Sequence, residues 1–304
     1  MKRKITTRIS EWWKIIKRSF KKFGSDRPVE LAGFTAYFAI FSMVPIIIII
    51  ISVFGTIMGD MVIRERLFEE LNSLVGQENT RILENAIENY EISEKSRIGT
   101  IIGALFFLFS ATTLFSMMQR SFNYIWRIRI KSNLKMGLLN LAKTRLLSFG
   151  IILILGLVLL VFLIADAIIL FFRDFLAGQI GTEFIVIARV ANILVPLAVV
   201  ATACTLIYRL MPDVRVKWRA CWFGGIFTAI LFAIGQLGIN TAISNTNLGE
   251  VYGTASSFVI ILIWIYFASI ILYFGAELTR QYSRFYNHDN TPANFASFFE
   301  ISKL

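Results

Sequence analysis

Six long apolar blocks dominate the pattern of hydrophobic and polar positions along the chain. Uncharged runs of 29, 22, 20, 19, 30 and 26 residues begin at positions 31, 98, 146, 190, 220 and 251. A helix needs about 20 mostly apolar residues to cross the hydrocarbon core of a bilayer. The blocks are continuously apolar rather than alternating, which favours helices over barrel strands. The pattern therefore predicts an all-α integral membrane protein with six transmembrane helices.

The blocks also indicate where each span lies. We expect a membrane domain over residues 28–279, with spans at about 31–57, 98–119, 146–172, 188–209, 220–241 and 254–277. The first block is too long for one plain crossing, and Pro45 lies in its middle. Two interpretations fit: a long tilted helix kinked at Pro45, or a helix whose ends extend beyond the hydrocarbon.

An amphipathic segment precedes the first span. Over residues 1–27, apolar positions recur every three or four residues, and lysines and arginines cover the opposite face. This spacing predicts a basic amphipathic helix in the inner interface, with a cytoplasmic helix packed on the bundle as the alternative. We expect Gly24 to end this helix, Ser25 or Asp26 to cap the next one, and Pro28 to lie in its first turn.

The polar segment between the first two spans also has helical periodicity. Residues 60–97 contain two apolar stripes at helical spacing, separated by Gly76. We expect a short helical hairpin that covers the outer face of the membrane domain.

The distribution of charge predicts the orientation. Residues 1–29 carry 10 Lys and Arg against 2 acids, residues 120–145 carry 7 against none, and residues 209–219 carry 4 against 1. Residues 60–97 instead carry 9 acids against 5 bases, and residues 241–250 have a single glutamate and no base. Six spans with both termini in the cytoplasm satisfy the positive-inside rule at these loops. Topology and contact with anionic lipid therefore explain the net charge of +11, and no nucleic-acid-binding motif competes with them.

Composition leaves little material for catalysis. Hydrophobic residues make up 56% of the chain, charged residues 17%, and mean hydropathy is +0.67. The single histidine, His288, lies in a polar tail, and Cys204 and Cys221 lie in or beside apolar runs. No hydrolase, nucleotide-binding or metalloprotease motif is present. We therefore expect no enzyme activity, no cofactor and no metal site.

Polar or structurally unusual residues inside the spans or next to their ends are the candidate site. They are Tyr37, Ser42, Pro45, Asp166, Asn192, Arg209, Asp213, Gln236, Asn240, Tyr252, Gly253, Trp264, Tyr266 and Glu277. Asp166 lies near the outer interface, where hydration alone can account for it. Arg209 and Asp213, four residues apart, fit either an ion pair or an Arg209 that only anchors its span. Gly275 and Ala276 are expected to allow close helix approach.

Several short segments occur in a characteristic order. They are Ala36 to Pro45, Asn123 to Trp126, Tyr208-Arg209 to Pro212-Asp213, Tyr252-Gly253, and Leu262 to Tyr266 running on to Gly275-Ala276-Glu277. By these segments the chain resembles the YihY/virulence factor BrkB family of bacterial inner-membrane proteins over roughly residues 15–285. The resemblance implies a six-helix membrane protein with both termini in the cytoplasm. A former ribonuclease BN label of the family does not fit a chain with one tail histidine and no acidic metal cluster.

The leading functional hypothesis is a transporter of an amphipathic or anionic envelope substrate such as a lipid, because the spans hold more polar residues than packing requires. The alternative is a membrane scaffold or interaction protein without transport, and an intramembrane enzyme comes third. The expected location is the bacterial inner membrane, with residues 280–304 as a cytoplasmic tail. The expected partners are membrane lipids, including anionic inner-leaflet lipid, and not nucleic acid; a homo-oligomer stays open.

Overall fold

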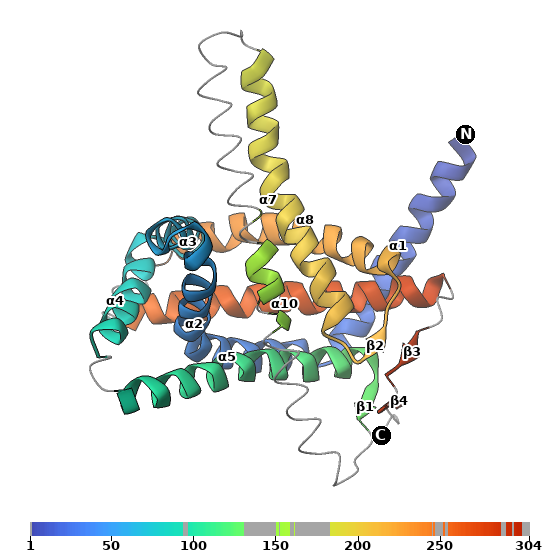
Figure 1. Cartoon of the computed structure of the whole chain (residues 1–304). Coiled ribbons are helices and arrows are strands. Elements are labelled where there is room, and N and C mark those ends of the chain that lie inside the picture. The colour runs from blue at the N-terminus through green and yellow to red at the C-terminus, as the bar shows by residue number, and fades with distance from the viewer. Residues whose placement is uncertain are drawn as a thin grey trace.

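The computed structural model is helical in all of its long elements (Figure 1). It describes residues 2–93, 97–130, 150, 151, 153–158, 161, 183–244, 246, 252, 255–286, 290–293 and 295–299. The helices are α1 (Lys2–Ser25), α2 (Pro28–Met58), α3 (Asp60–Val75), α4 (Gln77–Ser93), α5 (Arg97–Trp126), α7 (Glu183–Leu210), α8 (Trp218–Ser244) and α10 (Ser256–Phe285). The strands are β1 (Ile128–Ile130), β2 (Val214–Arg215), β3 (Thr291–Pro292) and β4 (Ala296–Phe298).

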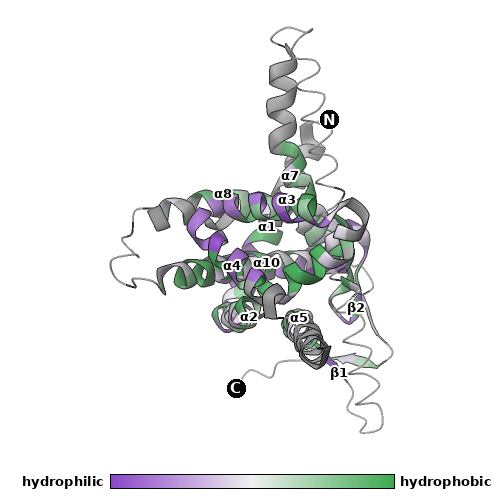
Figure 2. Ribbon diagram, turned by 60° about the vertical axis from the view of Figure 1, so that its left-hand side comes forward, coloured by the Kyte–Doolittle hydropathy of each residue, from purple (hydrophilic) through white to green (hydrophobic). Residues whose placement is uncertain are grey.

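Several of these helices are suited to a bilayer. Pro28–Ser52 in α2, Trp218–Ile239 in α8 and Ser256–Phe285 in α10 are long and apolar enough to cross it, and the apolar segment Leu194–Leu210 of α7 is shorter. Figure 2 shows hydrophobic residues (green) distributed along α7, α8 and α10. The helical class and the presence of several candidate spans are thus confirmed. Most of the predicted third span, residues 146–172, lies outside the described residues.

The turn between α1 and α2 differs from the expected cap. α1 continues past Gly24 to Ser25, and the residue before α2 is Arg27, whose backbone is left-handed with φ of 53°. Pro28 occupies the first turn of α2 as predicted, but no side chain caps this helix. Asp26 lies one residue too early to act as the N-cap, so its carboxylate is available for other contacts.

The first apolar block forms one helix. α2 has 31 residues, about 46 Å at 1.5 Å per residue, and continues through Pro45. It ends at Gly59, whose φ of 91° suits glycine. α3 and α4 then follow on either side of Gly76, which has φ of 87°, and form the predicted hairpin.

The hairpin is attached to the second half of α2. A buried apolar cluster joins the three helices through Ile47, Ile51, Phe54, Ile63, Leu67, Phe68, Leu83 and Ile87. Burial of one such side chain contributes roughly 1.5–3 kcal/mol, which is sufficient to hold two short helices whose other faces are charged.

α1 lies across the ends of α8 and α10 (Figure 1). Ile15 is fully buried, and the ring of Phe23 packs against Phe274 of α10 with 5.4 Å between centroids. Trp13 and Phe20 nevertheless remain 68% and 66% exposed. The Phe20 ring still packs against Phe274, with 4.8 Å between centroids, so the helix is packed on the bundle through this face while Trp13 stays exposed.

Short strands tie the C-terminal segment to two distant loops, which the all-α expectation did not include. β1 pairs antiparallel with β4, and β2 pairs antiparallel with β3. The strands have only two or three residues, too few for the period-2 pattern of a strand to stand out in the sequence. α10 continues to Phe285, past residue 280, and the boundary between membrane domain and tail stays a prediction.

Two glycines allow α7, α8 and α10 to approach closely. A Cβ on Gly275 would overlap the hydroxyls of Thr228 and Tyr208, which confirms the expected close approach at this position. A Cβ on Gly225 would lie 2.6 Å from the carbonyl oxygen of Ala201, a backbone atom that cannot move cheaply. Close backbone contact at small residues is a main source of helix association in membranes.

Substitution of glycine by alanine on α8 tests this packing. We expect Gly225→Ala to lower stability by about 1–3 kcal/mol, because the added methyl overpacks the contact with α7. Gly238→Ala is the matched control: nothing lies within 4 Å of its added Cβ, so the better helix propensity of alanine should leave stability unchanged or raised. Thermal unfolding in detergent measures both. Equal midpoints for the two variants would contradict the close contact.

Candidate functional site

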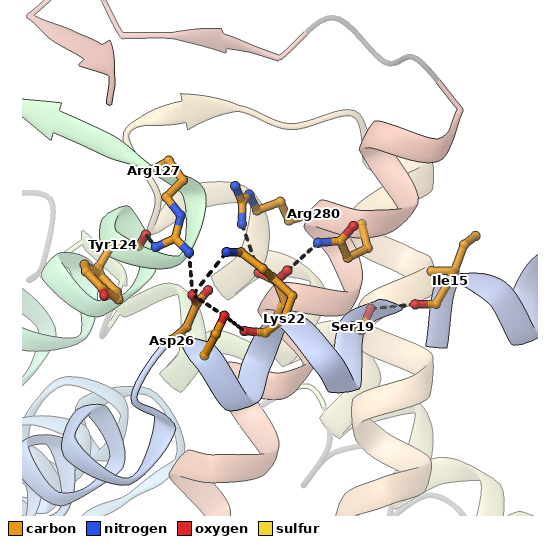
Figure 3. Close-up of polar contacts among 10 residues, drawn as sticks. Ile15, Ser19, Lys22, Asp26, Tyr124, Arg127 and Arg280 are labelled. Atoms are coloured by element: carbon orange, nitrogen blue, oxygen red, sulfur yellow. Dashed lines mark hydrogen bonds and ion pairs between the residues drawn. The ribbon is translucent and has the colours of Figure 1, made fainter. Parts of the chain in front are cut away.

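Buried charged side chains gather where the α1–α2 turn, the end of α5 and the last turns of α10 meet (Figure 3). Asp26 is 1% exposed, and its Oδ1 accepts a hydrogen bond from Nη2 of Arg127. Lys22 Nζ lies 3.9 Å from the same oxygen, and Ser25 Oγ donates to it at 3.4 Å. The ion pair thus joins the α1–α2 turn to the end of α5.

Arg127 is held from several sides. Its backbone is left-handed, with φ of 59°, directly after α5 ends. Nη1 donates to the carbonyl of Tyr124 at 3.2 Å, and the guanidinium lies 5.2 Å from the centroid of the Tyr124 ring. The Arg127 carbonyl accepts from the Phe299 amide at 2.9 Å. These contacts come from α5 and the C-terminal segment, so they position Arg127 independently of Asp26.

The second carboxylate of the cluster is Glu277 of α10, which is fully buried. Arg280 Nη1 lies 3.3 Å from its Oε2, and Gln281 Nε2 donates to its Oε1 at 2.5 Å. Spacings of three and four residues place all three side chains on one helix face. Removal of one partner from such a pair costs about 3–5 kcal/mol, because the other charge stays buried without compensation.

The cluster has more cations than anions. The two buried pairs, Arg127 with Asp26 and Arg280 with Glu277, balance each other, and the additional positive charge is that of Lys22, whose side chain is 41% exposed. A charge beside hydrocarbon is costly and marks a functional site by default. The arrangement can therefore attract an anionic group.

A second polar cluster connects α5 to the loop between α7 and α8. Asn123 donates from Nδ2 to Asp213 Oδ2 at 2.7 Å and accepts from the Asp213 amide at 2.8 Å. Gln119 Nε2 donates to Asp213 Oδ1 at 3.2 Å. The Asp213 carbonyl accepts from the Ala293 amide at 3.0 Å. Asp213 therefore connects α5 with the C-terminal segment.

The partner of Arg209 is the Trp218 ring, whereas the ion-pair interpretation predicted Asp213. The Arg209 guanidinium lies 5.5 Å from the centroid of the Trp218 ring, while the Asp213 carboxylate accepts from two amides of α5. α7 ends at Leu210, so Asp213 is beyond the helix and the four-residue helical spacing does not apply. Cation–π contacts at exposed sites contribute about 0.5–1 kcal/mol.

Buried hydroxyls form the polar contacts between the helices. Tyr208 OH lies 2.8 Å from Thr228 Oγ1 and donates to the Leu272 carbonyl at 2.8 Å. Thr35 Oγ1 lies 2.5 Å from Tyr273 OH. These contacts join α7, α8 and α10 to one another and α10 to α2.

The other sequence candidates do not form one site in the described residues. Ser42 is buried and donates to the Ser110 carbonyl at 2.8 Å. Tyr37 and Tyr252 are exposed, and Gln236, Trp264 and Tyr266 are half-buried. Asp166 and Gly253 lie outside the described residues, as do the side chains of Asn192 and Asn240. Of the fourteen candidates, Glu277 and Asp213 belong to the two polar clusters.

Sequence reasoning missed the partners that complete these clusters. Asp26 was considered as a helix cap, and Arg127 was counted only as a loop charge. Arg280 could have been found, because it follows Glu277 by three residues at a helix end. Arg127 and Asp26 are 101 residues apart, and no local pattern links them.

A large groove lies away from both clusters. It has a volume of about 1170 Å³ and lies in the α3–α4 hairpin. Its charged lining consists of Arg64, Glu65, Glu69, Glu78, Arg81, Glu84 and Glu88. Within the described residues, no group of three or more His, Cys, Asp or Glu side chains could hold a metal ion.

Comparison with known proteins gives a consistent family match. The family model described as "Virulence factor BrkB" matches residues 19–297. A UPF0761 membrane protein of Stenotrophomonas maltophilia is 26% identical over 267 residues, which cover 87% of this chain and 59% of the relative. A UPF0761 membrane protein of Pseudomonas aeruginosa is 28% identical over 265 residues, which cover 84% of this chain and 60% of the relative. No solved structure matches.

Double-mutant cycles test the partner of Asp213. We expect Asn123→Ala and Asp213→Ala to be non-additive, with a coupling free energy of about 1–3 kcal/mol, because they remove the same hydrogen bonds. The control cycle pairs Arg209→Ala with Asp213→Ala and should be additive within about 0.5 kcal/mol. The measurement is denaturant unfolding of the purified protein in mixed micelles. Strong coupling in the control cycle would restore the ion-pair interpretation.

Proposed function

This chain belongs to the virulence factor BrkB family, and we propose that it is a six-span inner-membrane protein that moves an anionic or amphipathic envelope substrate such as a lipid. It is a multi-pass membrane protein, as its candidate spans and its relatives indicate. The chain spans about three fifths of the length of the first relatives it matches. The proposal therefore rests on contacts within this chain.

Contacts between distant segments support six spans. The Asp26–Arg127 ion pair and the two strand pairs bring residues 26, 127–130, 214–215 and 291–298 to one end of the bundle. α2 and α5 lie between residue 26 and residues 127–130, and α8 and α10 lie between residues 214–215 and residues 291–298. A chain that returns to the same end must cross an even number of times. We therefore propose that α7 is one crossing and that residues 131–182, most of which lie outside the described residues, supply another.

The charge at this end supports the cytoplasmic orientation. The described segments that meet there are basic, including residues 120–130 and 209–219. The positive-inside rule then puts both termini in the cytoplasm. On α1, exposed Trp13 and Phe20 occur beside exposed Lys14, Lys17 and Lys21, which fits contact with anionic inner-leaflet lipid.

Topology can be tested with reporters fused within the full chain. Fusions at residues 85 and 180 should report the outer side, and fusions at residues 135, 215 and 290 should report the cytoplasm. An alkaline phosphatase and fluorescent protein pair gives opposite signals on the two sides. A cytoplasmic signal at residue 85 would overturn the orientation, and equal signals at 135 and 180 would remove the third span.

The observation that carries the transport proposal is the buried charge cluster, whose two ion pairs, Arg127 with Asp26 and Arg280 with Glu277, lie beside the partly exposed cation Lys22. Arg280 and Glu277 are almost fully buried on the same helix as the apolar Ser256–Phe285 stretch. A purely structural bundle gains little from such groups, because apolar residues of similar volume are often as stable. An anionic substrate that enters near this end would find cations already positioned.

Reconstitution into lipid vesicles tests this function. We expect the wild-type protein to speed the transfer of a fluorescent lipid with an anionic headgroup more than that of a zwitterionic one. Arg280→Gln should lower this rate about tenfold, which corresponds to a barrier about 1.4 kcal/mol higher. The matched control is Arg66→Gln on α3, outside the cluster, with a change below roughly twofold. Size-exclusion profiles establish that each variant is folded.

The scaffold alternative is favoured by two other observations. The contacts at Gly225 and Gly275 leave α7, α8 and α10 tightly packed, and the charged groove of the α3–α4 hairpin offers a surface for a partner protein. If folded wild-type protein moves neither lipid, the scaffold becomes the better proposal. An intramembrane enzyme remains the third alternative after the transporter and the scaffold, and we do not propose an enzyme activity for this chain.

A further inference from the structure

We propose that Asp26 is an internal anion that occupies the position of a ligand oxyanion at Arg127, so that ligand binding and the docking of α1 compete. The ligand group is a phosphate-type oxyanion, either in a lipid headgroup or free in solution. The inference rests on the proposed function, because it specifies the anion position within the same cluster.

The first argument is that the Asp26–Arg127 contact is incomplete. Arginine side chains and carboxylates often pair through two parallel hydrogen bonds that use both carboxylate oxygens. Here Arg127, Lys22 and Ser25 all contact Oδ1. Oδ2 is buried, and none of the described residues donates a hydrogen bond to it. Leaving a buried carboxylate oxygen without a donor is costly, so a better-matched oxyanion can displace this carboxylate.

The second argument is that Arg127 keeps its place without Asp26. Its guanidinium is bound to the Tyr124 carbonyl, and its backbone is bound to Phe299 beside the β1–β4 ladder. The guanidinium would therefore remain directed toward the vacated position. Guanidinium groups bind phosphate oxygens in a planar, two-pronged geometry.

The third argument concerns what moves. Asp26 is part of the turn that ends α1, and the following residue, Arg27, has the left-handed backbone at which the chain changes direction. α1 is otherwise held to the bundle by one face, which includes Ile15, Ser19 and Phe23. Displacement of Asp26 therefore removes the polar anchor at the end of α1 and weakens the docking of its buried face, while Glu277 still neutralises Arg280 on its own helix.

Competition predicts a rise in affinity when the internal anion is removed. A ligand that must displace Asp26 binds with its intrinsic affinity multiplied by the fraction of protein in which Asp26 is away. Asp26→Asn keeps the shape and removes the charge, so we expect about tenfold tighter binding of inorganic phosphate to the purified protein. Arg127→Gln should abolish this binding. Unchanged or weaker binding by a folded Asp26→Asn protein overturns the proposal.

A second measurement keeps Asp26 in place and does not need that variant to fold. Ser19 is fully buried on α1, so Ser19→Cys should react slowly with a maleimide until α1 is released. Phosphate should speed this reaction about tenfold, whereas chloride at equal ionic strength should not. Lys21→Cys, which is exposed, is the control and should react quickly throughout. Identical rates in phosphate and chloride also overturn the proposal.

An experiment with lipid vesicles distinguishes the two sources of the oxyanion, a lipid headgroup and free phosphate. Vesicles of phosphatidylglycerol should release α1 if the ligand is a headgroup, and phosphatidylcholine vesicles with dissolved phosphate should release it if the ligand is free. Because both measurements report binding rather than transfer, they are independent of the transport assay. Transport without any phosphate effect overturns this inference alone, and a phosphate effect without transport overturns only the transport proposal.

Discussion

A charged side chain inside an apolar helix bundle must be matched by a neighbour, and the ion pair of Asp26 and Arg127 meets this constraint where most segments converge. Asp26 lies in the α1–α2 turn, and Arg127 follows directly after the last residue of α5. β1 begins directly after Arg127 and pairs with β4, so the C-terminal segment arrives at the same place. The position of α1 and the return of the C-terminal segment to the end of α5 both depend on this junction.

The interior of the bundle obeys a different constraint. Without water in the hydrocarbon, hydroxyls bind backbone carbonyls or each other, as Tyr208 and Thr228 do. Gly225 and Gly275 then allow the backbones to approach within reach of these short side chains. This part of the bundle is tightly packed, so the side chains that have room to rearrange lie at the ends of the bundle.

The two ends carry opposite character. The end formed by Arg127, Arg280 and the basic loops suits anionic groups, whereas the α3–α4 hairpin at the far end of α2 carries a groove rich in glutamate. A substrate with an anionic headgroup and an apolar body would be attracted to the first end and would find apolar helix faces beside it. This asymmetry connects the charge pattern, the packing and the proposed transport.

The sequence by itself determined the helical class, the presence of several membrane spans and the hairpin around Gly76. Continuous apolar blocks and helical periodicity are local properties, and the need to satisfy backbone groups in lipid leaves helices as the solution. Glu277 stands out because it is a charged residue at the end of an apolar block, and Asp213 stands out because it follows Arg209 by four residues at the end of another span. Tertiary structure alone decided their surroundings. Asp26 pairs with Arg127 across 101 residues, and Asp213 binds Asn123 across 90, because hydrogen-bond partners are selected by proximity in space. The ladders of two or three residues form for the same reason, since their strands are too short to leave a pattern and exist only where the folded chain brings two segments together.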